Sequence, residues 1–189
     1  MEDRWNVALH SQGHAAIFAV YDGHGGSQVS TYLMENLSQT ILQDVTLLSD
    51  PVGALKRSFA TCDHAATEEN PKRNPLSSSP GPGSTAVVLL ILPPRLLVAN
   101  VGDSRATFVN RDGEIVFETV DQRPTCPTEI PRLRDLGGKI RCVNGVTRVS
   151  GILAVSRAFG NAGLKQFIKA EPEVTDINTL FNGKQFNED

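Results

Sequence analysis

The chain has 189 residues, of which 40% are hydrophobic and 21% charged, a composition typical of one soluble globular domain. Its net charge is -3 and no block of like charges occurs, which argues against nucleic acid or an anionic membrane as the main partner. No apolar run has the length of a membrane span, and the N-terminus lacks the hydrophobic region of a secretory signal peptide.

The most informative stretch of the chain follows a β-prone run over residues 15–21. This run leads into Asp22-Gly-His-Gly-Gly26, which places a carboxylate, an unobstructed backbone carbonyl and an imidazole at one edge of a sheet. Carboxylate and carbonyl oxygens are ligands of divalent cations, and histidine transfers protons near neutral pH. The alternative interpretation is a glycine-rich turn that contains an incidental histidine.

Two helices and a loop are predicted next. Residues 27–42 carry apolar side chains at every fourth position, and Ser27 is the candidate N-cap. A second helix is expected to begin at Asp50-Pro51, since an N-cap residue followed by proline is a frequent helix start. Residues 68–83 contain Asn-Pro, a serine run and Pro-Gly-Pro-Gly, and are predicted to form a flexible internal loop rather than a domain boundary.

A strand-rich block follows this loop. Short β-prone runs at residues 84–92, 95–101, 105–110 and 114–119 are separated by turn residues, which predicts an antiparallel meander. Because residues 86–92 are continuously apolar, we expect both faces of that strand to be buried.

A short helix and a hairpin complete the predicted elements. Residues 128–136 are expected to form the helix, which Gly137-Gly138 would end. Residues 139–149 are expected to form a hairpin that turns at Asn144-Gly145. Helices before and after a run of antiparallel strands predict an α+β layered fold.

The three cysteines, Cys62, Cys126 and Cys142, are too few and too scattered for a disulfide framework or a cysteine-based zinc site. We therefore expect free thiols and a reducing compartment. Together with the absence of a signal peptide, this predicts an intracellular protein of the cytoplasm or nucleus.

Five segments form a pattern in their order and spacing. They are Met1-Glu-Asp3, Asp22-Gly-His-Gly-Gly26, Gly83-Ser-Thr-Ala-Val87, Val98-Ala-Asn-Val-Gly-Asp-Ser-Arg105 and Gly151-Ile-Leu-Ala-Val-Ser-Arg-Ala-Phe-Gly160. Together, from Met1 to about Ile177, they resemble the metal-dependent type 2C serine/threonine protein phosphatases. The resemblance implies an α-β-β-α sandwich of two antiparallel sheets flanked by helices. It also implies that residues 1–189 are a single domain of this kind, incomplete in this chain.

The resemblance implies hydrolysis of phosphoserine and phosphothreonine in protein substrates by water activated at a binuclear Mg²⁺ or Mn²⁺ centre. It makes Asp22 the carboxylate that bridges two ions and gives the main-chain oxygen of Gly23 to one of them. Glu2 and Asp3 match the acidic pair around the same metals, mostly through bound water, and Asp103 would bind an additional ion. Without the resemblance, these residues have other interpretations, as solvated charges at an N-terminus and as turn residues.

His24 is the candidate general acid that protonates the leaving seryl or threonyl oxygen. The alternative is a histidine that fills a polar turn. Arg105 and Arg157 are expected to brace the structure rather than to touch substrate.

The chain departs from the family pattern at two positions. Asp121-Gln122 stands where the family has Asp-His, and Gly160-Asn161 stands where it has Gly-Asp. The family's phosphate-binding arginine and its last two metal aspartates are not matched in this sequence. These departures leave a second interpretation open, a phosphatase-like binding module without catalysis, either a pseudophosphatase or an inactive truncated isoform. For the enzyme we expect phosphoprotein substrates and a monomeric chain.

Overall fold

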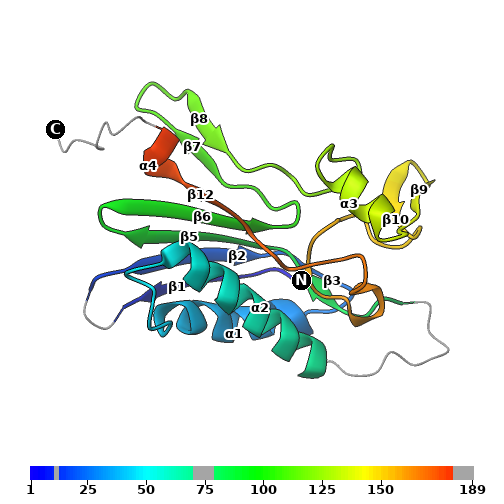
Figure 1. Cartoon of the computed structure of the whole chain (residues 1–189), viewed down its shortest axis with the longest axis horizontal. Helices are drawn as coiled ribbons and strands as arrows, with labels where there is room; N and C mark the ends of the chain where they lie inside the picture. The colour runs from blue at the N-terminus through cyan, green and yellow to red at the C-terminus, as the bar shows by residue number, and fades with distance from the viewer. Residues whose placement is uncertain (11–12, 70–78, 181–189) are drawn as a thin grey trace.

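A five-stranded antiparallel sheet lies at the centre of the computed structural model, which describes residues 1–10, 13–69 and 79–180. Two long helices, α1 (Gln28–Leu42) and α2 (Pro51–Glu69), cover one face of this sheet (Figure 1). The strand order is β1-β2-β5-β6-β12. The strands are β1 (Arg4–Leu9), β2 (Ala16–Tyr21), β5 (Ala86–Leu92), β6 (Arg95–Val101) and β12 (Glu173–Asp176).

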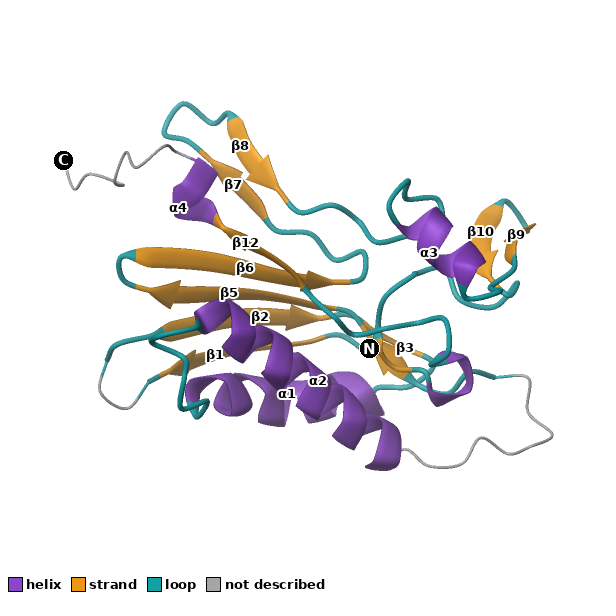
Figure 2. Cartoon of the chain, in the orientation of Figure 1, coloured by secondary structure: helices purple, strands orange, loops and turns teal. Residues whose placement is uncertain are grey.

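Smaller elements lie around this sheet, and Figure 2 shows their distribution. Three short strands, β3 (Gly23–His24), β4 (Gly83–Ser84) and β11 (Phe159–Gly160), form a sheet in the order β11-β4-β3. Two hairpins stand apart, β7 (Thr107–Val109) with β8 (Ile115–Glu118) and β9 (Ile140–Val143) with β10 (Val146–Val149). The remaining helices are α3 (Glu129–Asp135), α4 (Ile177–Leu180) and a 3₁₀ turn at Ala162–Leu164. The predicted α+β class is confirmed.

The core lies between the sheet and the two long helices. The predicted apolar face of α1 is fully buried, because its members recur every fourth residue and therefore share one side of the helix. These residues are Val29, Leu33, Leu37 and Ile41. The start of α2 is also as predicted, since the Asp50 carboxylate accepts a hydrogen bond from the Gly53 N–H at 3.0 Å. Ser27 is the N-cap of α1, although its side chain makes no capping hydrogen bond.

The outer face of the sheet, away from α1 and α2, carries apolar side chains that remain accessible. Trp5 is 70% exposed and Phe18 is 44% exposed. In β5, alternate residues from Ala86 to Leu92 are buried toward the helices, while those between them are half-buried. The prediction that both faces of this strand are buried is therefore wrong, because the described residues cover its outer face only in part.

The four strands of the predicted antiparallel meander belong to two separate sheets. Strands β5 and β6 pair within the large sheet, whereas β7 and β8 pair only with each other. The chain leaves the large sheet at Gly102, whose φ of 103° is a left-handed conformation that favours glycine.

The predicted 139–149 hairpin is present and turns at Asn144-Gly145, with φ values of 51° and 79°.

One sequence prediction concerns a segment that is only partly described. Of the predicted loop over residues 68–83, the part at 70–78 lies outside the described residues, and β4 begins at Gly83. Cys62, Cys126 and Cys142 are free, and only Cys142 is exposed. Among the helices that the structure describes, none is long and apolar enough to span a bilayer.

Candidate active site

The small β11-β4-β3 sheet joins three of the motifs that are far apart in the sequence. Gly23 and His24 of β3 pair with Ser84 and Gly83 of β4, and Gly160 of β11 pairs with Gly83. Asp22 lies between the end of β2 and the start of β3. The sheet therefore fixes the Asp-Gly-His segment against the Gly-Ser-Thr segment and against the end of the Ser-Arg-Ala-Phe-Gly segment.

Thr85 connects this sheet to the turn that carries Asp103. Its hydroxyl accepts a hydrogen bond from the Asp22 N–H at 3.1 Å, and its own N–H donates to the Asp22 carbonyl at 2.9 Å. The same hydroxyl lies 2.6 Å from the hydroxyl of Ser104. Because Thr85 contacts both segments, the backbone positions of Asp22 and of the 102–104 turn depend on each other.

The carboxylate of Asp22 has an unfavourable electrostatic environment. Partial desolvation at the strand end raises its pKa, and the neighbouring carboxylates of Asp3 and Asp103 raise it further. The side chain of Asp22 is nevertheless exposed. A bound cation would favour the ionised form of Asp22 and so relieve the effect of these two like charges on it. The structure thus brings together three of the predicted metal-binding side chains.

Gly23 and Glu2 lie against each other at the start of this site. A Cβ atom on Gly23 would lie 2.5 Å from the Glu2 carbonyl oxygen and 2.7 Å from the Ser30 hydroxyl, so glycine is required here by close packing. One carboxylate oxygen of Glu2 accepts a hydrogen bond from the Gly26 N–H at 2.8 Å. Glu2 therefore stabilises the glycine turn, and this carboxylate oxygen already has a protein partner.

His24 lies at the other end of the same short strand. Its Nε2 atom is 2.9 Å from Oδ1 of Asn161, which is fully buried. Position 161, where the chain departs from the family pattern, is thus in direct contact with the candidate general acid. The direct contact with His24 could not be predicted, because 137 residues separate the two side chains along the chain.

The comparisons with known proteins agree with these motifs. The Protein phosphatase 2C family model matches residues 1–186. The chain belongs to the Protein phosphatase 2C family.

Individual relatives give the same result. The chain is 37% identical over 178 residues to "Probable protein phosphatase 2C 56" of Oryza sativa subsp. japonica, a match that covers 93% of this chain and 49% of that protein. A solved structure described as "Structure of a C.elegans sex determining protein" superposes with a TM-score of 0.77 at 27% identity over 93% of this chain and 44% of that one. A serine-threonine phosphatase 2C from Toxoplasma gondii has the same fold, with a TM-score of 0.75 at 22% identity over 93% of this chain and 68% of that one. The chain spans about half the length of the curated phosphatase 2C relatives it matches.

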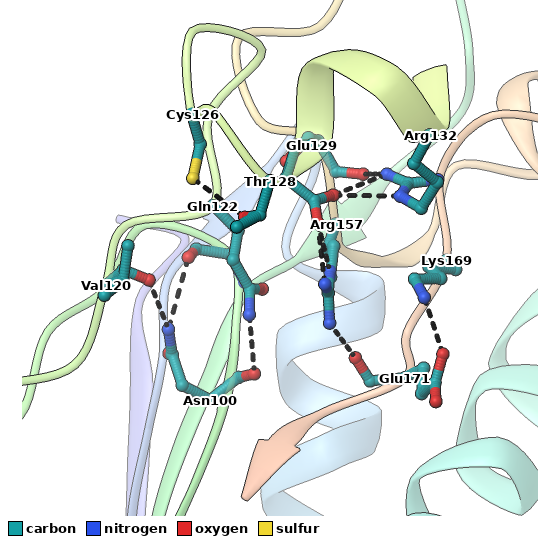
Figure 3. A network of polar contacts seen from close by, with 12 residues as sticks. Asn100, Val120, Gln122, Cys126, Thr128, Glu129, Arg132, Arg157, Lys169 and Glu171 are labelled. Atoms are coloured by element: carbon teal, nitrogen blue, oxygen red, sulfur yellow. Dashed lines mark hydrogen bonds and ion pairs between the residues drawn. The ribbon is translucent and has the colours of Figure 1, made fainter. Parts of the chain in front are cut away.

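Gln122, at the position where the family pattern has histidine, has a structural role. Its side-chain oxygen accepts a hydrogen bond from the Gly102 N–H at 2.8 Å. Its amide nitrogen donates to the Asn100 carbonyl at 3.3 Å (Figure 3). Gln122 is 2% exposed. Glutamine in place of histidine at position 122 therefore does more than remove a titratable group. The amide of Gln122 braces the turn that carries Asp103.

Asp103 itself is paired with a cation. Arg123 donates from Nε to the Asp103 carboxylate at 3.1 Å, and Arg123 is itself exposed. A surface pair of this kind contributes little free energy and exchanges readily with solvent. Asp103 can therefore change partners at small cost.

Glu129 is a residue that sequence reasoning missed. Its carboxylate is 1% exposed and lies 2.6 Å from the guanidinium groups of both Arg132 and Arg157 (Figure 3). Burial raises the pKa of Glu129, but the hydrogen bonds from Arg157 and Arg132 outweigh it and hold the pKa below its usual range. Arg157 also donates to the Glu171 carbonyl at 3.0 Å. The bracing role predicted for Arg157 is confirmed.

Arg105 has the same kind of role at the surface. Its guanidinium donates to the carboxylate of Asp121 at 3.0 Å and to that of Glu118 at 3.2 Å. The prediction that Arg105 braces the structure is also confirmed.

The donor atoms around Asp22 fit a hard divalent cation in kind but not in number. All candidate ligands are oxygen atoms, which Mg²⁺ and Mn²⁺ prefer. Within residues 1–10, 13–69 and 79–180, no three His, Cys, Asp or Glu side chains converge closely enough to hold a metal ion by themselves. Water or further groups would have to complete the coordination shell around Asp22.

Proposed function

We propose that this protein is a serine/threonine protein phosphatase that hydrolyses phosphoserine and phosphothreonine in other proteins, with two or more Mg²⁺ or Mn²⁺ ions. The observation that carries the proposal is geometric: the β11-β4-β3 sheet holds Gly23 and His24, directly after Asp22, against Ser84 and Gly83 of β4. The carboxylates of Asp3 and Asp103 lie near enough to raise the pKa of Asp22. Thr85 maintains this arrangement through its contacts with Asp22 and Ser104. Membership of the Protein phosphatase 2C family supports the reaction class.

Five residues would hold the ions. Asp22 would bridge two of them, and the main-chain oxygen of Gly23 would bind one. Asp3 and Glu2 would act mostly through bound water, and Asp103 would bind a further ion after release from Arg123. When bound, the ions would neutralise phosphate charge and lower the pKa of water from about 16 to about 7.

His24 would supply the proton that the leaving group needs. As the bond between phosphorus and the seryl or threonyl oxygen breaks, a water oxygen bonds to phosphorus and His24 gives a proton to the leaving oxygen. The hydrogen bond from His24 to Asn161 orients the ring for this transfer.

The same proposal includes the substrates, the oligomeric state and the cellular compartment of the protein. Its substrates are phosphoproteins, and residues 1–189 belong to a single phosphatase domain, of which they are a part, in a protein that acts as a monomer. The three free cysteines support a reducing compartment, the cytoplasm or the nucleus.

A second candidate function is a phosphatase-like binding module that does not hydrolyse phosphoesters. Two observations favour it: Asp103 is paired with Arg123, and the described residues contain no converging set of three ligand side chains. This candidate and the enzyme differ in one measurable property, which is turnover in the presence of Mn²⁺.

The test is Mn²⁺-dependent hydrolysis of a phosphothreonine peptide by the wild-type protein and by Asp22→Asn. The control is Asp112→Asn, which neutralises an exposed acid in the turn between β7 and β8. The proposal predicts turnover that Asp22→Asn abolishes and Asp112→Asn preserves. No turnover by the wild type, with Mn²⁺ binding retained, would favour the binding module instead.

A further inference from the structure

The backbone of Asn161 is fixed by hydrogen bonds on both sides. It is fully buried, its backbone N–H donates to the Pro82 carbonyl at 2.8 Å, and its own carbonyl accepts from the Leu164 N–H at 2.8 Å. The preceding N–H, of Gly160, donates to the Asp63 carboxylate at 2.9 Å. The side chain of Asn161 therefore projects from a fixed backbone.

The orientation of the Asn161 amide follows from its two partners. Its Nδ2 atom lies 3.0 Å from the Gly81 carbonyl oxygen, and a carbonyl oxygen can only accept a hydrogen bond. The amide nitrogen must therefore face Gly81, which leaves Oδ1 to face His24. The opposite orientation would place two acceptors, the amide oxygen and the Gly81 carbonyl, against each other.

This orientation determines the protonation of the His24 ring. The Asn161 Oδ1 atom, 2.9 Å from Nε2, can only accept a hydrogen bond. The Nε2 atom must therefore carry a proton, and in the neutral ring Nδ1 then carries none. Among the described residues, Asn161 is the one hydrogen-bond partner of this ring.

The neighbouring backbone leaves room for this contact. A Cβ atom on Gly83 would lie 2.3 Å from Asn161 Oδ1 and 2.5 Å from His24 Nε2. Any larger residue at this position would therefore separate the two side chains. The absence of a side chain at Gly83 allows β4 to pass beneath the pair.

We propose that Asn161 is a positioning residue that fixes His24 as the Nε2–H tautomer and assigns proton exchange with substrate to Nδ1. The second part rests on the proposed phosphatase function, whereas the first part does not. The Asn161 amide does this without a charge, while the aspartate of the family pattern would place a carboxylate beside the ring. In the proposed reaction, Nδ1 gives a proton to the leaving oxygen while Nε2 keeps the proton that it donates to Asn161.

The test is the tautomer of His24, measured from the ¹⁵N chemical shifts of its ring in protein labelled at histidine. The chain has four histidines, and the signals of His24 are identified because they are missing from the spectrum of a His24→Gln variant. Asn161→Gly removes the acceptor without strain, because Asn161 has a left-handed φ of 51°. The matched control is Asn144→Gly, at an exposed residue with the same φ of 51°.

At a pH where the ring is neutral, we expect wild type and Asn144→Gly to show a protonated Nε2 and an unprotonated Nδ1. Asn161→Gly should bring the two nitrogen shifts closer together, as the tautomers mix. Asn161→Asp, which keeps an acceptor, should retain the Nε2–H form. A wild-type ring protonated at Nδ1, or shifts unchanged in Asn161→Gly, would overturn the proposal whether or not the protein is an enzyme.

An activity measurement tests the assignment of Nδ1. A general acid contributes about 10²–10⁴-fold, so Asn161→Gly should slow hydrolysis of a phosphoserine peptide at least about tenfold more than that of p-nitrophenyl phosphate. Equal losses of activity on both substrates, with the tautomer changed as expected, would contradict only the second part of the proposal, the assignment of proton exchange to Nδ1. The assignment of the tautomer would stand. A wild type without turnover would contradict the proposed function and leave the tautomer result standing.

Discussion

Asp22 and Thr85 are joined by two hydrogen bonds although 63 residues separate them along the chain. The Thr85 hydroxyl accepts from the Asp22 N–H at 3.1 Å, and the Thr85 N–H donates to the Asp22 carbonyl at 2.9 Å. This double contact determines where the candidate metal-binding carboxylate leaves the sheet. It gives the Gly-Ser-Thr segment a structural role, which is to fix the backbone of Asp22.

Replacement of Thr85 by valine should therefore weaken both the fold and the site. Valine keeps the shape but loses the hydroxyl, which leaves the Asp22 N–H and the Ser104 hydroxyl without this partner. We expect the free energy of unfolding in urea to fall by about 1–3 kcal/mol. Thr107→Val, at an exposed position in β7, should change it by less than about 0.5 kcal/mol. Equal stability of the two variants would mean that the Thr85 hydroxyl does not brace Asp22.

Asp22→Asn should stabilise the metal-free chain. Because the folded-state pKa of Asp22 is raised by desolvation and by Asp3 and Asp103, its ionisation opposes folding as the pH rises above about 4. The gain at neutral pH should be smaller than about 1 kcal/mol, since the exposed side chain is screened by solvent. It should vanish in acid, where Asp22 is protonated in both states. Thermal melting with a chelator present measures it, and a loss of stability at neutral pH would contradict the like-charge account.

Glu129→Gln should be strongly destabilising at neutral pH. The substitution leaves the charges of Arg132 and Arg157 beside a buried neutral amide, and the loss of one partner from a buried pair costs about 3–5 kcal/mol. The folded-state pKa of Glu129 is lowered, so its stabilisation is complete above the unfolded-state pKa of about 4.3. It is lost as the pH falls through the lower folded-state pKa.

The measurement is urea unfolding of wild type and Glu129→Gln from neutral pH down into this acid range. The difference between the two proteins should shrink as the pH falls. Glu118→Gln breaks an exposed pair with Arg105 and should cost under about 1 kcal/mol at any pH. A constant difference between wild type and Glu129→Gln at all pH values would show that ionised Glu129 is not the source of the stability.

The outer sheet face gives a direct spectroscopic prediction. Trp5 is the single tryptophan of the chain and is 70% exposed beside other apolar side chains of β1 and β2. If the chain is a monomer with this face open, tryptophan emission should be that of a solvated indole, and acrylamide should quench it readily. Blue-shifted emission that resists quenching would show that another chain or segment covers the face. Phe18→Lys, on the neighbouring strand, should then restore quenching.

Much of the fold could be predicted because its causes are local. The fourfold periodicity of α1, the cap at Asp50 and the Asn144-Gly145 turn each depend on residues close together in sequence. The division of the meander was missed because strand pairing beyond Gly102 depends on long-range packing. For the same reason the sequence marked Asn161 as a departure from the family pattern but did not predict its contact with His24. The pairing of Glu129 with Arg157, 28 residues away, likewise has no local pattern.

Calorimetric titration of Mn²⁺ into the wild-type chain, Asp22→Asn and His24→Ala tests the central claim most directly. The account assigns metal binding to Asp22 and proton transfer to His24, so it predicts that the wild type and His24→Ala bind Mn²⁺ with nearly equal affinity. Asp22→Asn should bind at least about tenfold more weakly, a loss of about 1.4 kcal/mol, because it removes the negative charge proposed to hold the ions. Equal affinity of Asp22→Asn and wild type for Mn²⁺ would contradict the account.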